Sequence, residues 1–153
     1  MSENNGRGDF YSGIPWVYVT REQAWAHPKG KLNGVLWAIG LLFIGIGLAK
    51  AWFLLSSGGG LGLALFNSVW PVLTGIGLLM RVPWSVYLAV VSAGLTIYAL
   101  IRGFGESQSV YYMIETVAYV GILFYLIDGD RPNLIYRHRY RKYSAVRGDN
   151  EPQ

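Results

Sequence analysis

The sequence predicts an all-α integral membrane protein, a four-transmembrane-helix up-down bundle with short interfacial segments at both cytoplasmic ends. Three observations support this prediction. Hydrophobic residues make up 52% of the 153-residue chain and charged residues only 14%, whereas about 25% of the residues in a soluble domain are charged. Four apolar runs are long enough to cross a bilayer. The basic residues concentrate on one side of these runs.

Each apolar run approaches the roughly 20 residues that a helix needs to cross a bilayer. The runs are continuous and do not alternate with a period of two, which indicates helices and excludes barrel strands. Short connections between them favour antiparallel neighbours. The predicted spans are residues 33–55, 61–80, 84–101 and 110–127; residues 1–32 form an N-terminal arm and residues 128–153 a basic aromatic tail.

Lys and Arg in the flanking segments predict the orientation of the spans. If the N-terminus is cytoplasmic, Arg102 is the only basic residue that flanks the spans on the opposite side. Lys50 lies within a span, and the remainder of the 13 Lys and Arg residues lie on the cytoplasmic side. We therefore expect a multi-pass protein with both termini in the cytoplasm, in a bacterial inner membrane.

Aligned by depth, the four spans each place one polar residue in the same layer of the outer membrane half. Lys50 and Glu115 lie about 7–8 Å below the outer boundary, at 1.5 Å per residue. Asn67 and Thr96 fall at a similar depth. Because charge inside a bilayer is costly, such groups normally face partners or water. The layer is either an ion pair that fixes helix register, or Lys50 reaching the interface beside a protonated Glu115, or a site for a proton, an ion or a polar headgroup.

Small residues recur in the spans, which predicts close approach of helix backbones. In the first span these are Gly40, Gly45, Gly47 and Ala49; the second and third spans contribute Gly75, Gly77, Ala89, Ala93 and Gly94.

Both cytoplasmic segments are expected to lie near the membrane surface. Thr20 and Gln23 form a capping box for a short helix that Pro28 ends. In the tail, a helix over residues 134–143 would place Tyr136, Tyr140 and Tyr143 on one side. Anionic lipid headgroups and protein partners are the expected ligands, and nucleic acid is not. The candidate contact residues are Trp16, Trp25, Tyr136, Arg137, Arg139, Tyr140, Arg141, Lys142 and Tyr143.

The residue types that most enzyme chemistry requires are scarce. The chain has no Cys and two His residues, His27 and His138, both outside the spans. We therefore expect no metal, no cofactor and no catalysis. The leading hypothesis is a non-catalytic accessory or scaffold subunit that docks other integral membrane subunits. The alternatives are a small oligomeric transporter or channel that uses Lys50 and Glu115, and a binder of lipid, quinone or pigment.

Overall fold

The protein is seen in a computed structural model that describes residues 13–106 and 108–141. The described chain is mostly helical, and four of its helices are long and apolar enough to cross a membrane, as predicted. In chain order the elements are β1 (Trp16–Tyr18), α1 (Arg21–Ala26), the 3-10 turn η1 (Pro28–Gly30), α2 (Gly34–Ser56), α3 (Leu61–Leu79), α4 (Ser85–Arg102), α5 (Ser109–Asp128), α6 (Asp130–Arg137) and β2 (Arg139–Arg141).

Side-chain caps mark where α1 and α2 begin. The Asn33 side chain accepts a hydrogen bond from the Leu36 N–H, at 3.0 Å, and starts α2. The Thr20–Gln23 capping box is present as predicted, with both reciprocal hydrogen bonds made. All four long helices begin and end within one residue of the predicted spans.

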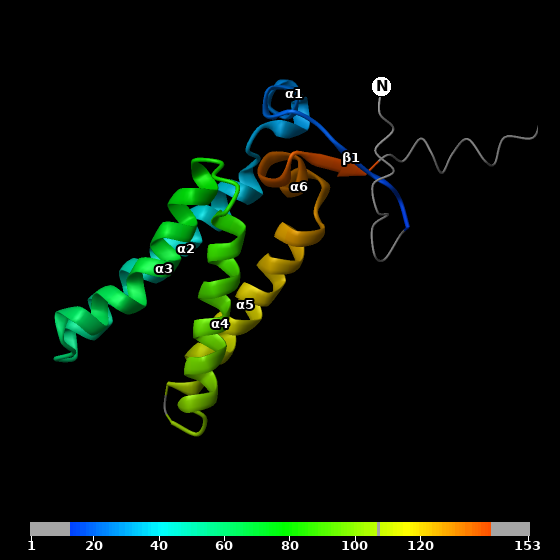
Figure 1. Ribbon diagram of the computed structural model, residues 1–153. Helices are drawn as coiled ribbons and strands as arrows, with labels where there is room; N and C mark the ends of the chain where they lie inside the picture. Colours follow the sequence, from blue (N-terminus) through cyan, green and yellow to red (C-terminus); the bar gives the residue numbers. More distant parts are fainter. Residues whose placement is uncertain (1–12, 107, 142–153) are drawn as a thin grey trace, which may run out of the picture.

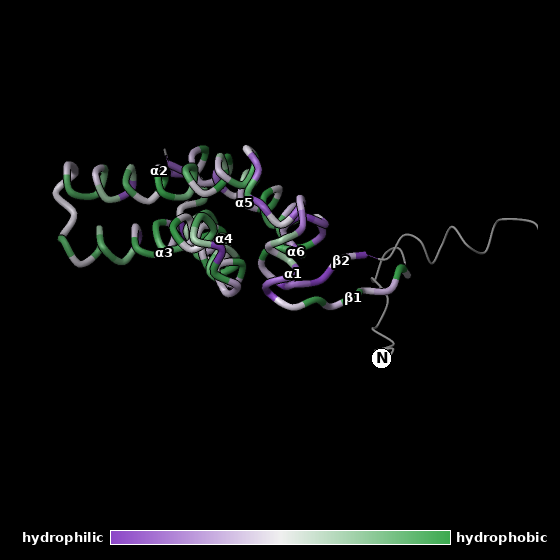
Figure 2. The backbone as a smooth tube through the Cα atoms, turned by 90° about the horizontal axis from the view of Figure 1, so that it is seen from above, coloured by the Kyte–Doolittle hydropathy of each residue, from purple (hydrophilic) through white to green (hydrophobic). Residues whose placement is uncertain are grey.

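The long helices form two hairpins that diverge from each other. We call α2 with α3 the first hairpin and α4 with α5 the second hairpin; α3 also packs against α4. Figure 1 shows the two hairpins separating toward the end away from α1 and α6, and Figure 2 shows the same separation from above. The buried apolar core lies in the other half, nearer α6, and includes Leu36, Phe43, Leu78, Val86, Ala89 and Leu126.

Glycines set the close packing of the first hairpin. A Cβ on Gly75 would lie 2.4 Å from the Gly40 carbonyl oxygen, and one on Gly47 would lie 2.9 Å from the Ser68 carbonyl oxygen. Real Cβ atoms do not approach backbone so closely, so these positions require glycine. Gly45 and Gly94 have nothing near their Cβ position. Only part of the predicted small-residue set therefore forms helix contacts.

The segments before α2 and after α5 pack together into one unit, here called the terminal module, comprising β1, α1, η1, α6 and β2. β1 pairs antiparallel with β2, with Trp16 opposite Arg141 and Tyr18 opposite Arg139. The Val19 N–H also donates to the His138 carbonyl at 2.9 Å. The N-terminal and C-terminal segments are thus hydrogen-bonded to each other at one end of the membrane helices.

The predicted continuous helix over residues 134–143 is wrong beyond Arg137. His138 adopts a left-handed conformation (φ 51°) and ends α6, and Arg139–Arg141 form β2. Tyr140 therefore does not share a helix face with Tyr136. Tyr136 is 2% exposed, and its hydroxyl donates to the Leu78 carbonyl at 2.8 Å. Tyr143 lies outside the described residues.

Replacing Tyr136 with Phe should lower the free energy of unfolding by about 1 kcal/mol, because the Leu78 carbonyl loses the shorter of its two hydrogen bonds and keeps the one from the Arg81 N–H at 3.2 Å. Tyr140→Phe is the matched control, since that side chain is exposed. Thermal unfolding in detergent would measure both variants. Equal stability of the two would contradict a structural role for the Tyr136 hydroxyl.

Candidate functional site

Three members of the predicted polar layer meet between the two hairpins. Lys50 Nζ of α2 lies 2.6 Å from Glu115 Oε1 of α5, which is an ion pair. The Glu115 side chain is 2% exposed and the Lys50 side chain 16%. The structure thus shows Lys50 and Glu115 paired, whereas a ligand site at this layer stays a prediction.

Thr96 of α4 completes this cluster, which we call the Lys50–Thr96–Glu115 cluster. Its hydroxyl donates to Glu115 Oε1 at 3.1 Å and accepts from Lys50 Nζ at 3.5 Å. The bond to Glu115 is the shorter of the two, and the 3.5 Å contact with Lys50 is long for a hydrogen bond. The cluster thus links the first hairpin to both helices of the second hairpin.

Asn67 does not join the cluster, although it was predicted in the same layer. Its side-chain amide donates to the Leu63 carbonyl one turn earlier in α3, at 2.9 Å. A second polar link between the hairpins, which the sequence prediction missed, pairs the hydroxyls of Thr74 and Ser92 at 3.2 Å. The only sequence signal for this contact was the depth of the two hydroxyl residues within their spans.

A cavity of about 1010 Å³ opens between the hairpins beside the cluster. All of its helical lining residues lie in the halves of α2–α5 farther from the terminal module, or within a turn of the helix midpoints. The wall is mostly apolar and aromatic, as in typical ligand sites. Aromatic lining residues are Phe53, Phe66, Trp70, Tyr98, Tyr111, Tyr112 and Tyr119.

A few polar residues belong to this mostly apolar lining. Lys50, Thr96 and Asn67 line the cavity, whereas Glu115 lies behind the wall. Trp70 Nε1 is buried without a hydrogen-bond partner among the described residues. Tyr119 is 1% exposed and stacks on Phe43, with ring centroids 4.8 Å apart. Its hydroxyl interacts electrostatically with Glu115 but makes no hydrogen bond of normal geometry within the described chain.

The chemistry that these groups support is recognition. In the part of the chain that the structure describes, no three His, Cys, Asp or Glu residues come together as metal ligands would. The buried ion pair is neutral overall, and it holds Lys50 at the cavity wall. An apolar cavity with a few convergent polar groups can orient an amphiphilic ligand.

The terminal module holds the other predicted contact residues that the structure describes, and two of these are buried. Trp16 is 7% exposed, because Arg139 and Arg141 stack on its ring at 4.3 and 5.1 Å. Trp16 and Tyr136 thus belong to the interior, which corrects the expectation that they contact lipid or a partner. Arg141 also pairs with Asp128 and Asp130.

The accessible residues of the terminal module include Trp25 and Tyr140, which are 36% and 40% exposed. The Trp25 ring contacts the guanidinium groups of Arg21 and Arg81, at 4.2 and 5.7 Å. Burial, and secondarily the positive charge of Arg139, lower the pKa of Arg137 from its ordinary value. Lys142, also predicted as a contact residue, lies outside the described residues.

Comparisons of this chain with protein-family models, curated proteins and solved structures find no match. The functional assignment therefore rests on the geometry of the cavity and its polar wall.

Proposed function

We propose that this is a non-catalytic membrane protein that binds a lipophilic ligand in the cavity between its two hairpins. The observation that carries the proposal is the cavity itself, about 1010 Å³ in volume, with an aromatic wall. Such a volume accommodates a large amphiphile. The ligand's apolar part would contact Phe53 and Phe66, and its polar end the wall near Lys50.

Polar contacts at the split between the hairpins support this proposal. The Lys50–Glu115 ion pair and the Thr74–Ser92 contact join the hairpins across the space between them. The apolar core in the half nearer α6 is buried. The cavity in the other half is therefore not a consequence of poor packing along the whole length of the helices. In this proposal the four helices form the predicted up-down bundle, and the ligand fills the space between the hairpins in the half farther from the terminal module.

Filling the cavity should remove the ligand. Ala99 lines the cavity on α4, and Ala99→Phe adds a ring inside it. Ala38→Phe is the matched control, because Ala38 lies on the exposed surface of α2 and outside the cavity lining. Protein purified from native membranes should yield a stoichiometric lipophile by mass spectrometry for the wild type and Ala38→Phe, and several-fold less for Ala99→Phe. Equal yields from both variants would contradict the proposal.

A second candidate function is the accessory or scaffold subunit. The ordered terminal module favours it, because Trp25 and Tyr140 are exposed aromatic side chains beside Arg residues, and such residues are common interface anchors. The same purification tests it: a second protein at defined stoichiometry would support docking. Recovery of the protein free of any partner would count against docking and leave the ligand hypothesis intact.

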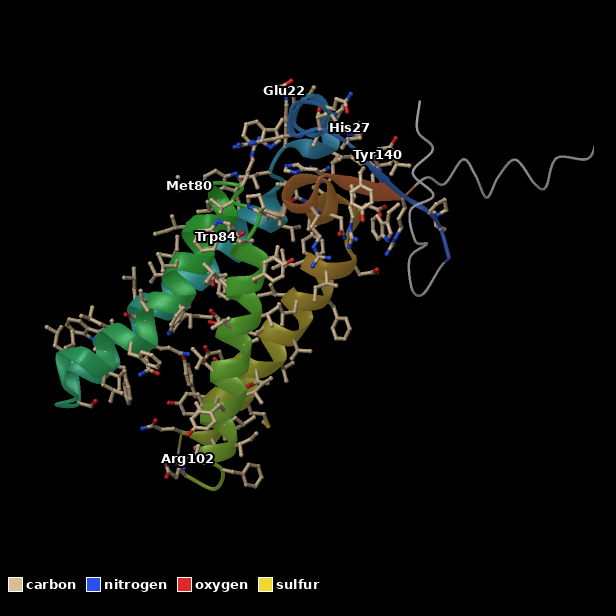
Figure 3. All side chains as sticks on the ribbon, in the orientation of Figure 1. Glu22, His27, Met80, Trp84, Arg102 and Tyr140 are labelled. Atoms are coloured by element: carbon tan, nitrogen blue, oxygen red, sulfur yellow. The ribbon has the colours of Figure 1, made fainter. Side chains whose placement is uncertain are left out.

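We also propose that the terminal module faces the cytoplasm of a bacterial cell. Arg102 lies at the opposite end of the molecule from Glu22, His27 and Tyr140 (Figure 3). The described basic residues outside the membrane helices cluster near the module, as the positive-inside rule requires. They are Arg21, Lys29, Lys31, Arg81, Arg131, Arg137, Arg139 and Arg141.

Cysteine labelling tests this orientation directly, because the chain has no native Cys. In intact spheroplasts, a membrane-impermeant maleimide should label Glu106→Cys, in the α4–α5 connection, and spare His27→Cys. Permeabilisation should expose both to the reagent. Labelling of His27→Cys in intact spheroplasts would reverse the proposed orientation.

A further inference from the structure

Two side chains of the cavity wall can only donate hydrogen bonds. The ammonium group of Lys50 and the indole N–H of Trp70 have no acceptor capacity. They come from the two helices of the first hairpin and both line the cavity. A ligand that satisfies them must bring acceptor atoms.

Both donors have unused capacity. Of the three protons on Lys50 Nζ, Glu115 Oε1 and Thr96 Oγ1 accept two. Trp70 Nε1 is buried and makes no hydrogen bond with the described residues. An unsatisfied buried donor is costly. A ligand acceptor in the cavity would take the third proton of Lys50 Nζ.

The charge of the site limits what kind of acceptor fits. Glu115 already neutralises Lys50, and its side chain is only 2% exposed. A carboxylate or phosphate ligand would compete with Glu115 for Lys50 and leave a buried negative charge without compensation. Such uncompensated charges are strongly destabilising. An uncharged acceptor adds a hydrogen bond and leaves the ion pair intact.

We propose that the cavity ligand is an uncharged lipophile whose polar end carries carbonyl oxygen, as in an ester or a ketone, and that Lys50 donates a hydrogen bond to this oxygen. This inference rests on the proposed function, since it names the chemistry of the ligand in that cavity. The aromatic wall, including Phe53 and Phe66, contacts the apolar tail.

Brominated acyl chains test the inference, because they quench nearby tryptophan fluorescence. The protein is placed in nanodiscs of ether-linked phosphatidylcholine, which has no ester carbonyl to compete. Trp37, Trp52 and Trp84, which are exposed, are replaced by Phe. The difference in fluorescence between this background and the same background with Trp70→Phe added gives the signal of Trp70. The probes are methyl dibromostearate, the dibromostearate anion at a pH that ionises it, and dibromo-octadecane.

The ester should quench Trp70 at concentrations about tenfold lower than either the anion or the hydrocarbon, as expected for a hydrogen bond to a charged donor. In Glu115→Gln, Lys50 loses its counterion, so the preference should shift about tenfold toward the anion. In Lys50→Met/Glu115→Leu, the ester should lose most of its advantage over the hydrocarbon.

Two results would overturn the inference while the proposed function stands: binding of the anion as tight as that of the ester, or equal binding of the ester and the hydrocarbon. If no probe quenches Trp70 above the Trp70→Phe background, the inference and the proposed ligand-binding function both fail.

Discussion

Lys50→Met should lower the free energy of unfolding by about 3–5 kcal/mol, because it leaves Glu115 buried without a counter-charge. The Glu115 carboxylate is 2% exposed and keeps only the Thr96 hydroxyl as a hydrogen-bond donor of normal geometry among the described residues. The double variant Lys50→Met/Glu115→Leu should recover most of the loss, since apolar residues replace a buried ion pair at little net cost. Glu115→Leu alone should cost less than Lys50→Met, because the longer Lys50 side chain lies partly exposed at the cavity wall.

Reversible unfolding in mixed micelles with SDS, followed by circular dichroism, would measure this mutant cycle. The coupling energy between the two positions should be about 2 kcal/mol or more. Asn67→Leu is the matched control, because Asn67 lies at a similar depth but, among the described residues, its side chain bonds within its own helix. Strictly additive losses in the cycle would show that the pair does not stabilise the fold.

Gly75→Leu should separate the helices of the first hairpin and lower the free energy of unfolding by about 3 kcal/mol, at the upper end of overpacking effects. Even a Cβ at this position would lie 2.4 Å from the Gly40 carbonyl oxygen and 3.0 Å from the Ile44 nitrogen. Those atoms are backbone, so the helices must move apart to relieve the contact. The cavity wall, which α2 and α3 share, would be displaced with them.

Gly45→Leu provides the comparison, because Gly45 lies on the same hairpin with nothing within 4 Å of its Cβ position. That variant should unfold at the wild-type SDS concentration or slightly higher, since leucine favours helix over glycine. A wild-type stability for Gly75→Leu, or an equal loss in both variants, would contradict a specific backbone crossing at Gly40 and Gly75.

The polar layer shows what can be predicted from the depth of a residue within its span, and what cannot. Helical rise determines how deep Lys50, Thr96 and Glu115 lie, so their shared layer followed from the sequence. Which way each side chain faces depends on helix rotation and crossing, which the spacing within one span does not set. Asn67 has the same depth and bonds instead to its own helix.

In the terminal module, a local feature was predictable from the sequence and a long-range pairing was not. Its capping box was predictable because Thr20 and Gln23 are three residues apart. The pairing of Trp16 with Arg141 joins residues at opposite ends of the described chain through strands of three residues each. Strands this short have too little alternation to be recognised, and the basic aromatic sequence was consistent with a helix.

By itself, the sequence determined that the chain carries four membrane-length helices, where each begins and ends, and which polar residues share a depth. These properties depend on composition and helical rise, and in α2 on the Asn33 cap, all of which are local. Only the tertiary structure decided that the hairpins diverge, that a cavity opens between them, and that Lys50 meets Glu115 at its wall. Those features depend on helix crossing, and crossing is set by close contacts such as Gly40 with Gly75 between residues far apart in the chain. Glycine also occurs where no atom lies within 4 Å of the Cβ position, as at Gly45.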